Sequence, residues 1–334
     1  MPDPETAAAG AKPPDPATTA AGAKPAKTRK SYRVAGFIIL GLIFSGIYFF
    51  FAWIIQQPQN INAIVLRPTV GDNQYYKWDP IAGIKKKTLY VEAADGSKLH
   101  CWLFPVAGSD RIAIVSHGNA GNISNRFYIA NALTKAGCSV LLYDYRGYGL
   151  STGNPTISGI LADGLSVYDY VHDKLHFPDN KIFLYGESIG SGVTSNLAVN
   201  RPCAGVILQS GIASLPAMGR KLFPMLYVYP DFAYPEPHLD NVAAMEQITA
   251  PILFLHGKKD TIVPFQHSQE MFAGAHEPKQ IVLLEDCGHN DMGVQNTEQF
   301  QGSIKAFVEK VSSQQNSTPQ NSTPQHSTPQ HSTP

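Results

Sequence analysis

The chain has 334 residues and a formal net charge of +0, which leaves room for one large domain or two small ones. This charge balance gives no support to a broad nucleic-acid-binding role. No C-x-x-C pair occurs, which excludes a zinc ribbon and a thioredoxin-type motif. The four cysteines are interpreted as small core side chains, and they are Cys101, Cys138, Cys203 and Cys287.

The N-terminal segment, residues 1–33, is predicted to be disordered. Most of it is rich in Ala, Pro, Gly and Thr and holds almost no large apolar side chains, so it cannot bury a core. Residues 2–13 recur in nearly the same form as residues 14–25. Two short copies are too few for a solenoid, and the duplication is interpreted as a linker repeat without a site.

Residues 34–55 are apolar and contain no charged side chain. A helix of this length rises about 1.5 Å per residue and spans roughly 33 Å, which is enough for a bilayer core. Trp53 fits an interfacial position. The alternative is a signal peptide, but the apolar run and its leader are too long and no A-x-A site follows. The sequence therefore predicts an uncleaved transmembrane helix.

Basic residues crowd the N-terminal flank of this helix, whereas Arg67 alone lies within about fifteen residues of the other flank. The positive-inside rule then predicts a cytoplasmic N-terminus and a large domain outside the cytoplasm, in the periplasm of a bacterium or the lumen or exterior of a eukaryotic cell. Asn122 and Asn316 would be acceptors for glycosylation only in the eukaryotic case. The basic residues are Lys24, Lys27, Arg29, Lys30 and Arg33.

A connector with weak signals is expected over residues 56–84, before a domain over residues 85–311. The domain begins with a predicted hairpin around Asp95-Gly96, after which short apolar runs alternate with helical stretches. This alternation predicts an α/β fold, with a mostly parallel sheet, helices on both of its faces and a site at the carboxyl ends of its strands. The expected strands are residues 88–93, 98–104, 112–115, 139–143, 182–185, 206–209, 252–255 and 281–284, and the expected helices are 126–136, 157–171, 193–199, 265–273 and 297–311.

Residues 211–249 interrupt the alternation and are predicted to form a small cap over the site, because they follow a strand's carboxyl end. The aromatic residues of the cap have two interpretations: they line an acyl pocket, or they pack the cap onto the body. They are Phe223, Tyr227, Tyr229, Phe232 and Tyr234.

The C-terminal tail, residues 312–334, is predicted to be disordered, because it ends in a pentapeptide repeated four times. His326 and His331 in the repeats are weak candidates for metal ligands, and a remnant of repeat expansion is the favoured interpretation.

The strongest motif is Gly186-Glu-Ser-Ile-Gly190, which fits G-x-S-x-G. An apolar run precedes it and a helical stretch follows it, which is the setting of a nucleophile elbow. Glycine on both sides of Ser188 suits a sharp turn in which neighbouring residues must be small. A chance match to a short pattern is the alternative.

A serine nucleophile needs a base, and the base needs an orienting acid. Asp260 follows one predicted strand and His289 follows the last, which gives the order Ser, Asp, His of an α/β hydrolase. We therefore assign Ser188 as nucleophile, His289 as general base and then acid, and Asp260 as the residue that holds the imidazole. Each residue considered alone has a structural alternative: Asp260 would be a loop carboxylate, and His289 would cap a loop. Asp144 is the runner-up acid.

An oxyanion hole needs two N–H donors. The first is assigned to the backbone of Ile189, the residue after the nucleophile. The second is assigned to the backbone of Asn119 in the glycine-rich loop after an early strand, with Ala120 as the fallback. His117 and His256 are expected to have structural roles.

Together these motifs resemble the α/β-hydrolase superfamily, especially membrane-associated α/β-hydrolase domain proteins near the serine aminopeptidase-like and lipase-like hydrolases. The resemblance covers residues 85–311 and implies a serine hydrolase. The branch that it resembles includes protein depalmitoylases, monoacylglycerol and lysophospholipid lipases, and esterases. Depalmitoylases of this branch have a cysteine-rich N-terminus, which this chain lacks. The motifs are His117-Gly-Asn-Ala-Gly, Asp144-Tyr-Arg-Gly-Tyr-Gly, Gly186-Glu-Ser-Ile-Gly, Asp260 with Val263-Pro264, and Gly288-His289.

The first hypothesis is a membrane-anchored serine hydrolase that cleaves an ester or thioester of a lipid-like or acylated substrate through an acyl-enzyme. The alternatives are an amidase or peptidase with the same triad and a non-enzymatic membrane-anchored scaffold. No cofactor or metal is expected, because neither the phosphate-loop signature nor zinc-ligand spacing occurs.

Overall fold

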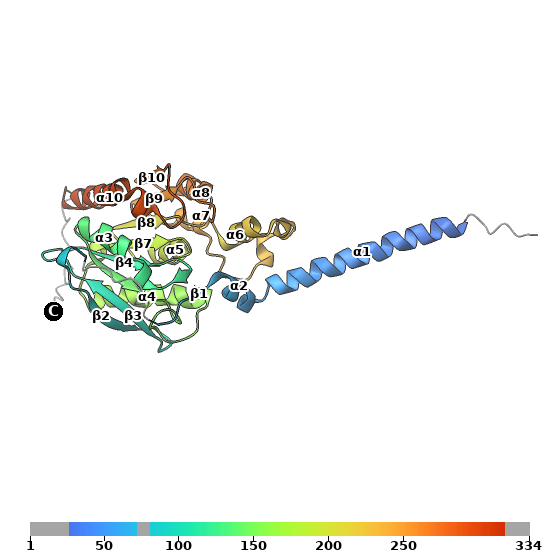
Figure 1. The fold of residues 1–334 in the computed structure, drawn as a ribbon, viewed down its shortest axis with the longest axis horizontal. Helices are drawn as coiled ribbons and strands as arrows, with labels where there is room; N and C mark the ends of the chain where they lie inside the picture. Colours follow the sequence, from blue (N-terminus) through green and yellow to red (C-terminus); the bar gives the residue numbers. More distant parts are fainter. Residues whose placement is uncertain (1–26, 72–80, 318–334) are drawn as a thin grey trace, which may run out of the picture. The chain divides into compact units, whose positions relative to one another are not determined.

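The computed structural model describes residues 27–71 and 81–317 (Figure 1). The chain divides into two units, Met1–Trp53 and Ile54–Pro334. Helix α1 runs over Lys27–Ile55 and therefore begins earlier than the apolar run itself. Residues 27–33, which we expected to be disordered, are part of this helix. The rest of that segment, residues 1–26, lies outside the described residues, as do residues 318–334 of the predicted C-terminal tail. Residues 312–317, which we also expected to be disordered, belong to the last helix, Thr297–Ser317.

The apolar part of α1 matches the predicted span. Its stretch Tyr32–Ile55 has a mean hydropathy of 2.4 and is long and apolar enough, by length and composition, to cross a membrane. Its large side chains are exposed, with Phe37 at 74% and Phe49 at 66%. Such exposure in water is costly for apolar side chains.

The second unit contains an eight-stranded sheet in the order β10-β9-β8-β7-β4-β6-β3-β2. The six strands from β10 to β6 are parallel to their neighbours, whereas β3 and β2 are antiparallel and form the predicted hairpin. The predicted fold class is confirmed. The strands are β2 (Lys87–Glu92), β3 (Lys98–Phe104), β4 (Ile112–Ser116), β6 (Ser139–Tyr143), β7 (Ile182–Glu187), β8 (Gly205–Gln209), β9 (Ile252–Gly257) and β10 (Lys279–Leu284).

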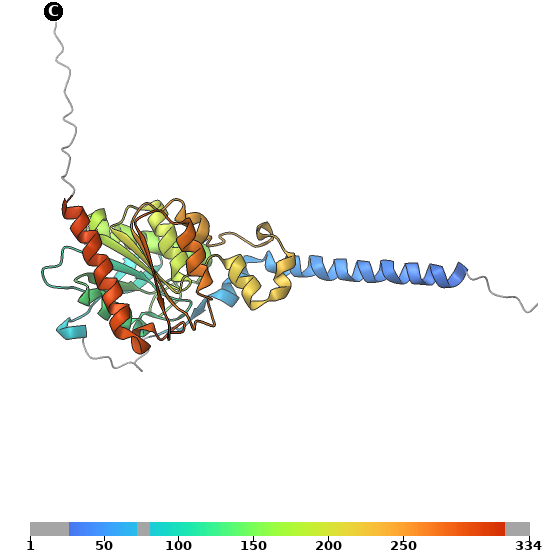
Figure 2. The same ribbon diagram turned by 90° about the horizontal axis from the view of Figure 1, so that it is seen from above.

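Helices cover both faces of this sheet (Figures 1 and 2). Ala113 and Val115 of β4 pack with α3 and α10, and Ile112 and Ile114 pack with α4 and α5. This alternation follows from the two-residue period of a strand, and a strand buried on both faces needs a continuous apolar run. The helices are α3 (Phe127–Lys135), α4 (Ile157–Asp173), α5 (Gly190–Asn200), α8 (Gln266–Gly274), α9 (Met292–Gln295) and α10 (Thr297–Ser317).

The segment that we expected to be a connector contributes regular structure to the domain. Helix α2 (Pro58–Val65) begins with a proline at its first position, where no N–H is needed. Strand β1 (Arg67–Pro68) then pairs in parallel with β5 (Ala120–Gly121) to make a separate two-stranded sheet. A short 3-10 helix, Ile81–Gly83, follows residues 72–80, which are outside the described part of the chain.

The predicted cap lies between β8 and β9. It consists of α6 (Leu215–Leu222), two 3-10 turns (Pro224–Val228 and Asp231–Ala233) and α7 (Asn241–Met245). Ser214 begins α6 by accepting a hydrogen bond from the N–H of Ala217, and Asp240 caps α7 in the same way.

Packing of the cap onto the body, one of the two interpretations of the cap aromatics, applies to two of these five residues. Tyr229 and Tyr234 are buried, at 4% and 7% exposure, and pack within the domain. Phe223, Tyr227 and Phe232 are exposed, at 46%, 71% and 85%. The second group lies on the outside of the cap, so these three side chains are available to a partner surface.

Candidate active site

Ser188 sits at a sharp turn between β7 and α5. Its φ angle is 55°, in the left-handed region that non-glycine residues rarely adopt. A side chain at Gly186 would lie 2.6 Å from the carbonyl oxygen of Gly190, and one at Gly190 would lie 2.1 Å from that of Ser116. The turn therefore requires both flanking glycines, which is the geometry of a nucleophile elbow.

The structure brings Ser188, His289 and Asp260 together at the carboxyl ends of β7, β10 and β9. Nε2 of His289 lies 3.1 Å from Oγ of Ser188, and Nδ1 of His289 lies 2.6 Å from Oδ2 of Asp260. The second carboxylate oxygen of Asp260 accepts hydrogen bonds from the N–H groups of Ile262 and Val263, at 2.9 and 2.8 Å. Three groups aligned in this way can pass a proton from the hydroxyl to the imidazole.

His256 is a further partner of the carboxylate. Its Nε2 lies 3.2 Å from Oδ2 of Asp260 and 2.9 Å from the carbonyl oxygen of Val263, and its Nδ1 lies 2.7 Å from Oγ of Ser268. Burial alone would raise the pKa of Asp260, but the hydrogen bonds from His256 and His289 outweigh burial and hold this pKa well below its usual range. Asp260 is therefore ionised at neutral pH and can stabilise a protonated imidazole.

The loop after β4, residues 117–122, is here called the oxyanion loop. Nδ1 of His117 lies 2.7 Å from the carbonyl oxygen of Gly118, and a carbonyl only accepts, so Nδ1 carries the proton. The N–H of Asn119 points away from that carbonyl, because the two belong to one planar trans peptide. Within residues 81–317, the N–H groups of Asn119 and Ile189 have no acceptor. Both predicted donors therefore have no competing acceptor among these residues, and the fallback Ala120 lies in β5 opposite Arg67.

His117 itself is unsuited to be the catalytic base. It is fully buried and its ring lies 4.2 Å from that of Tyr145. Its Nε2 finds no hydrogen-bond partner in the described part of the chain and lies 3.9 Å from Oδ1 of Asp144. Desolvation, helped by the charge of Arg126, lowers the pKa of His117 to about 4. The neutral ring acts as a fixed donor to the oxyanion loop.

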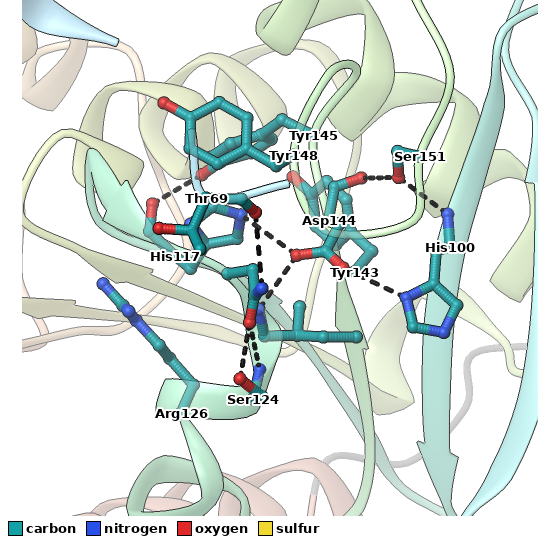
Figure 3. Close-up of polar contacts among 12 residues, drawn as sticks. Thr69, His100, His117, Ser124, Arg126, Tyr143, Asp144, Tyr145, Tyr148 and Ser151 are labelled. Carbon is teal, nitrogen blue, oxygen red and sulfur yellow. Dashed lines mark hydrogen bonds and ion pairs between the residues drawn. The ribbon is translucent and has the colours of Figure 1, made fainter. Parts of the chain in front are cut away.

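The runner-up acid, Asp144, is engaged elsewhere. Figure 3 shows its carboxylate between His100 and the oxyanion loop. Oδ2 of Asp144 lies 3.0 Å from Nδ1 of His100, and Oδ1 accepts a 2.8 Å hydrogen bond from the N–H of Ile123. Both oxygens thus hold neighbouring strands and loops, and His289 is paired with Asp260.

Glu187 and Arg126 form a buried ion pair that the motifs did not reveal. Oε2 of Glu187 accepts hydrogen bonds from Nε of Arg126 at 2.7 Å and from the N–H of Gly118 at 2.9 Å. Burial would raise the pKa of Glu187, but the charge and hydrogen bond of Arg126 lower it below its usual range. The residue before the nucleophile thus ties the oxyanion loop to the elbow. The sequence held one sign of this pair: Glu187 places a carboxylate next to the nucleophile, where the elbow is buried and a charge needs a partner.

No group of three or more His, Cys, Asp or Glu side chains within residues 27–71 and 81–317 is arranged to hold a metal ion. The cysteines are unpaired, and Cys101, Cys138 and Cys287 are buried. His326 and His331 lie outside the described residues.

Comparison with known proteins identifies the family of the chain. A family model described as serine aminopeptidase, S33, matches residues 108–230. Protein Rv2307c of Mycobacterium tuberculosis is 34% identical over 228 residues, which cover 68% of this chain and 80% of that protein. The chain belongs to the α/β-hydrolase superfamily.

Other members of the superfamily are similar over the same region. The α/β-hydrolase domain-containing protein 17C of Mus musculus is 28% identical over 225 residues, covering 66% of this chain and 67% of that protein. An esterase of Pyrococcus furiosus, Pf2001, superposes with a TM-score of 0.61 at 18% identity and covers 74% of this chain and 97% of its own. An esterase of Exiguobacterium antarcticum gives a TM-score of 0.53 at 20% identity, over 67% and 100%. At these identities the solved structures establish the fold.

Proposed function

We propose that this α/β hydrolase is a membrane-anchored serine hydrolase that cleaves an ester or thioester through an acyl-enzyme. The observation that carries the proposal is the hydrogen-bonded line from Ser188 through His289 to Asp260. The esterase names of the similar structures also favour it. A scaffold would have no need of a strained serine aligned with a base and a buried acid.

The first half of the reaction makes the acyl-enzyme. Nε2 of His289 takes the proton of Ser188 as Oγ attacks the acyl carbonyl carbon, and the carbonyl oxygen becomes an oxyanion. The N–H groups of Asn119 and Ile189 bind this oxyanion. The carbon–oxygen or carbon–sulfur bond then breaks, and His289 gives its proton to the departing alcohol or thiol. Asp260 stabilises the imidazolium throughout.

Water completes the cycle at the same site. His289 takes a proton from water while the water oxygen attacks the acyl carbon of the enzyme ester. The resulting oxyanion is bound by the same two donors, and collapse breaks the bond to Oγ of Ser188, which regains its proton from His289. The products are a carboxylic acid and the first alcohol or thiol.

The exposed cap favours an amphiphilic substrate at a membrane surface. Six large apolar side chains between the end of α6 and the second 3-10 turn are exposed, which is typical of an interaction surface. Figures 1 and 2 both place α6 at the same end of the domain as α2. Helix α2 begins at Pro58, three residues after the apolar helix ends at Ile55, so the chain itself keeps α2 within a few residues of the proposed membrane span. We call these six residues the cap cluster: Leu222, Phe223, Met225, Tyr227, Val228 and Phe232.

The proposed topology has a cytoplasmic N-terminus and an extracytoplasmic domain. Its support is the basic flank before the apolar helix, as the positive-inside rule requires. Protease added to sealed right-side-out vesicles should digest an epitope placed after Ser317 and spare one placed before Lys27. The opposite pattern would reverse the topology.

The first experiment is labelling of the detergent-solubilised full chain with a fluorescent fluorophosphonate, beside Ser188→Ala and Ser191→Ala. Ser191 is buried near the elbow and contacts Ile212 and Asn241 rather than His289, so it is the matched control. We expect labelling of wild type and Ser191→Ala and its loss in Ser188→Ala. Absence of labelling in folded wild type would contradict the proposal.

An amidase or peptidase that uses the same triad is the second candidate, favoured by the description of the matching family model. Wild type should therefore be assayed on matched p-nitrophenyl esters and aminoacyl p-nitroanilides. Higher kcat/KM on the anilides would replace the ester proposal with this one.

A further inference from the structure

Residues 65–71, which run from the last residue of α2 onward, lie against the oxyanion loop, and we call this segment the strap. The N–H of Arg67 donates to the carbonyl oxygen of Asn119 at 3.0 Å, and the N–H of Thr69 donates to that of Gly121 at 3.2 Å. In return, Nδ2 of Asn119 donates to the carbonyl oxygen of Val65 at 3.1 Å. The strap and the loop are therefore joined as neighbouring strands.

The strap is in turn fixed to the body of the domain. Nδ2 of Asn122 donates to the carbonyl oxygens of Thr69 and Gly71, at 3.3 and 2.9 Å. Gly149 donates to the carbonyl oxygen of Thr69 at 2.9 Å, and Gly71 donates to that of Gly149 at 2.7 Å. Leu66 is buried in the core at 4% exposure. Figure 3 draws Thr69 among the residues of this network. The strap thus has a defined position on both of its sides.

The effect on Asn119 follows from peptide geometry. Its carbonyl oxygen receives two donors, the N–H of Arg67 and, at 2.9 Å, the hydroxyl of Tyr148. These bonds fix the peptide plane after Asn119, and His117 fixes the plane before it through the carbonyl of Gly118. With both planes held, the direction of the Asn119 N–H has little freedom left. Preorganised donors of this kind cost no reorganisation during the reaction.

We propose that the strap is a positioning element of the oxyanion hole, with the N–H groups of Arg67 and Thr69 as the groups that act. This inference rests on the proposed hydrolase function and adds a part to its site. The strap begins ten residues after α1 ends at Ile55. The segment between the apolar helix and the hydrolase domain therefore serves catalysis as well as attachment.

The test uses pairs of substitutions in the full chain. Arg67→Pro removes the N–H that holds Asn119. Arg67→Ala keeps the N–H and removes the exposed side chain, whose Nε donates to the carbonyl oxygen of Ile64 at 3.3 Å rather than to the oxyanion loop. Leu66 has φ −94° and ψ 118°, which a following proline tolerates. Thr69→Pro and Thr69→Ala form a second pair that acts on Gly121. Fluorophosphonate titration counts active sites, so that kcat per titrated site, KM and the pH profile can be compared.

We expect each proline variant to lose about 10-fold in kcat per titrated site, less than the 10²–10³ that follows loss of a whole oxyanion donor. KM should stay within about twofold, because an oxyanion donor acts mainly in the transition state. The shape of the pH profile should not change, since His289 and Asp260 are untouched. The alanine variants should match wild type.

The inference is overturned if both proline variants keep wild-type kcat per titrated site, even with fewer active sites or a lower unfolding temperature. The strap would then be purely structural. It is equally overturned if Arg67→Ala loses as much kcat as Arg67→Pro, because the side chain would be responsible. A wild type that neither labels nor cleaves ester is a different result, since it refutes the proposed function before any variant is compared.

Discussion

Glu187, the residue before Ser188, accepts a 2.7 Å hydrogen bond from Nε of Arg126, and the two side chains are only 5% and 10% exposed. The same carboxylate oxygen holds the N–H of Gly118. One buried carboxylate thus joins the elbow, the oxyanion loop and the residue that leads into α3. Its contribution to stability and its contribution to catalysis can be separated by mutation.

Arg126→Met leaves Glu187 buried without its cation, and we expect the free energy of unfolding to fall by about 3 kcal/mol or more. The double variant Arg126→Met/Glu187→Leu removes both charges and should recover most of that loss. Its kcat should remain low, because Gly118 has lost its acceptor. Urea unfolding in mild detergent and kcat per titrated site provide the two measurements. Recovery of kcat together with stability would show that Glu187 does not position the oxyanion loop.

Asp260→Asn should reduce kcat by about 10⁴-fold while the fold is retained. An amide can still accept from Ile262 and Val263, but its NH₂ group would face Nδ1 of His289 and favour the wrong tautomer. Asp286→Asn is the control, because Asp286 is exposed and pairs with Lys259 rather than with His289. Loss of the same size in both variants would argue against a specific role for Asp260.

His117 gives the protein a stability that depends on pH. Its pKa in the folded state is about 4, below the ordinary value of about 6.5 that applies after unfolding. Between these values the unfolded chain binds a proton that the folded chain does not, so the free energy of unfolding falls as pH drops from about 6.5 to about 4. The full effect is on the order of 3 kcal/mol.

His117→Asn removes this titration and keeps an amide donor for the carbonyl of Gly118. Unfolding by urea at a series of pH values should show a shallower slope for the variant between about pH 6.5 and 4. Identical slopes in wild type and variant would mean that another group governs acid unfolding.

The cap cluster should matter only for substrates held in a bilayer. In proteoliposomes, Tyr227→Ser/Phe232→Ser should lower kcat/KM about 10-fold on a long-chain ester in the vesicle, because two large apolar side chains no longer contact lipid. Hydrolysis of a soluble short-chain ester should be unchanged. Tyr90→Ser, which changes an exposed aromatic residue of β2, is the control. Equal losses on both substrates would point to damage to the site rather than to lost membrane contact.

The features that depend on local sequence patterns could be predicted from the sequence. The sheet and its helices follow from apolar runs that alternate with amphipathic stretches, and all eight strands of the main sheet lie where these runs predict. The elbow was visible because only glycine fits two residues before and two residues after Ser188, at Gly186 and Gly190. Asp260 and His289 were selected because parallel strands bring their carboxyl ends to one edge.

The rest depends on contacts between distant residues. Arg126 and Glu187 are 61 positions apart, and no local sequence pattern around either residue predicts that they pair. The strap contains a two-residue strand, too short for a periodic pattern, and its pairing with β5 is set by the fold around it. Residues 27–33 were assigned to disorder by composition, whereas they continue the helix that follows.

The position of the strap also bears on how the domain can be separated from its helix. Only Gln56 and Gln57 lie between α1 and α2, so a cut at this point would release the catalytic domain with the strap in place. A cut after Gly71 would leave the strap on the helix side of the break. The strand that pairs with the oxyanion loop would then no longer be covalently joined to the rest of the domain. The two cleavage positions are fifteen residues apart. We expect cleavage between α1 and α2 to release an enzyme of full activity, and cleavage after Gly71 to release an impaired one.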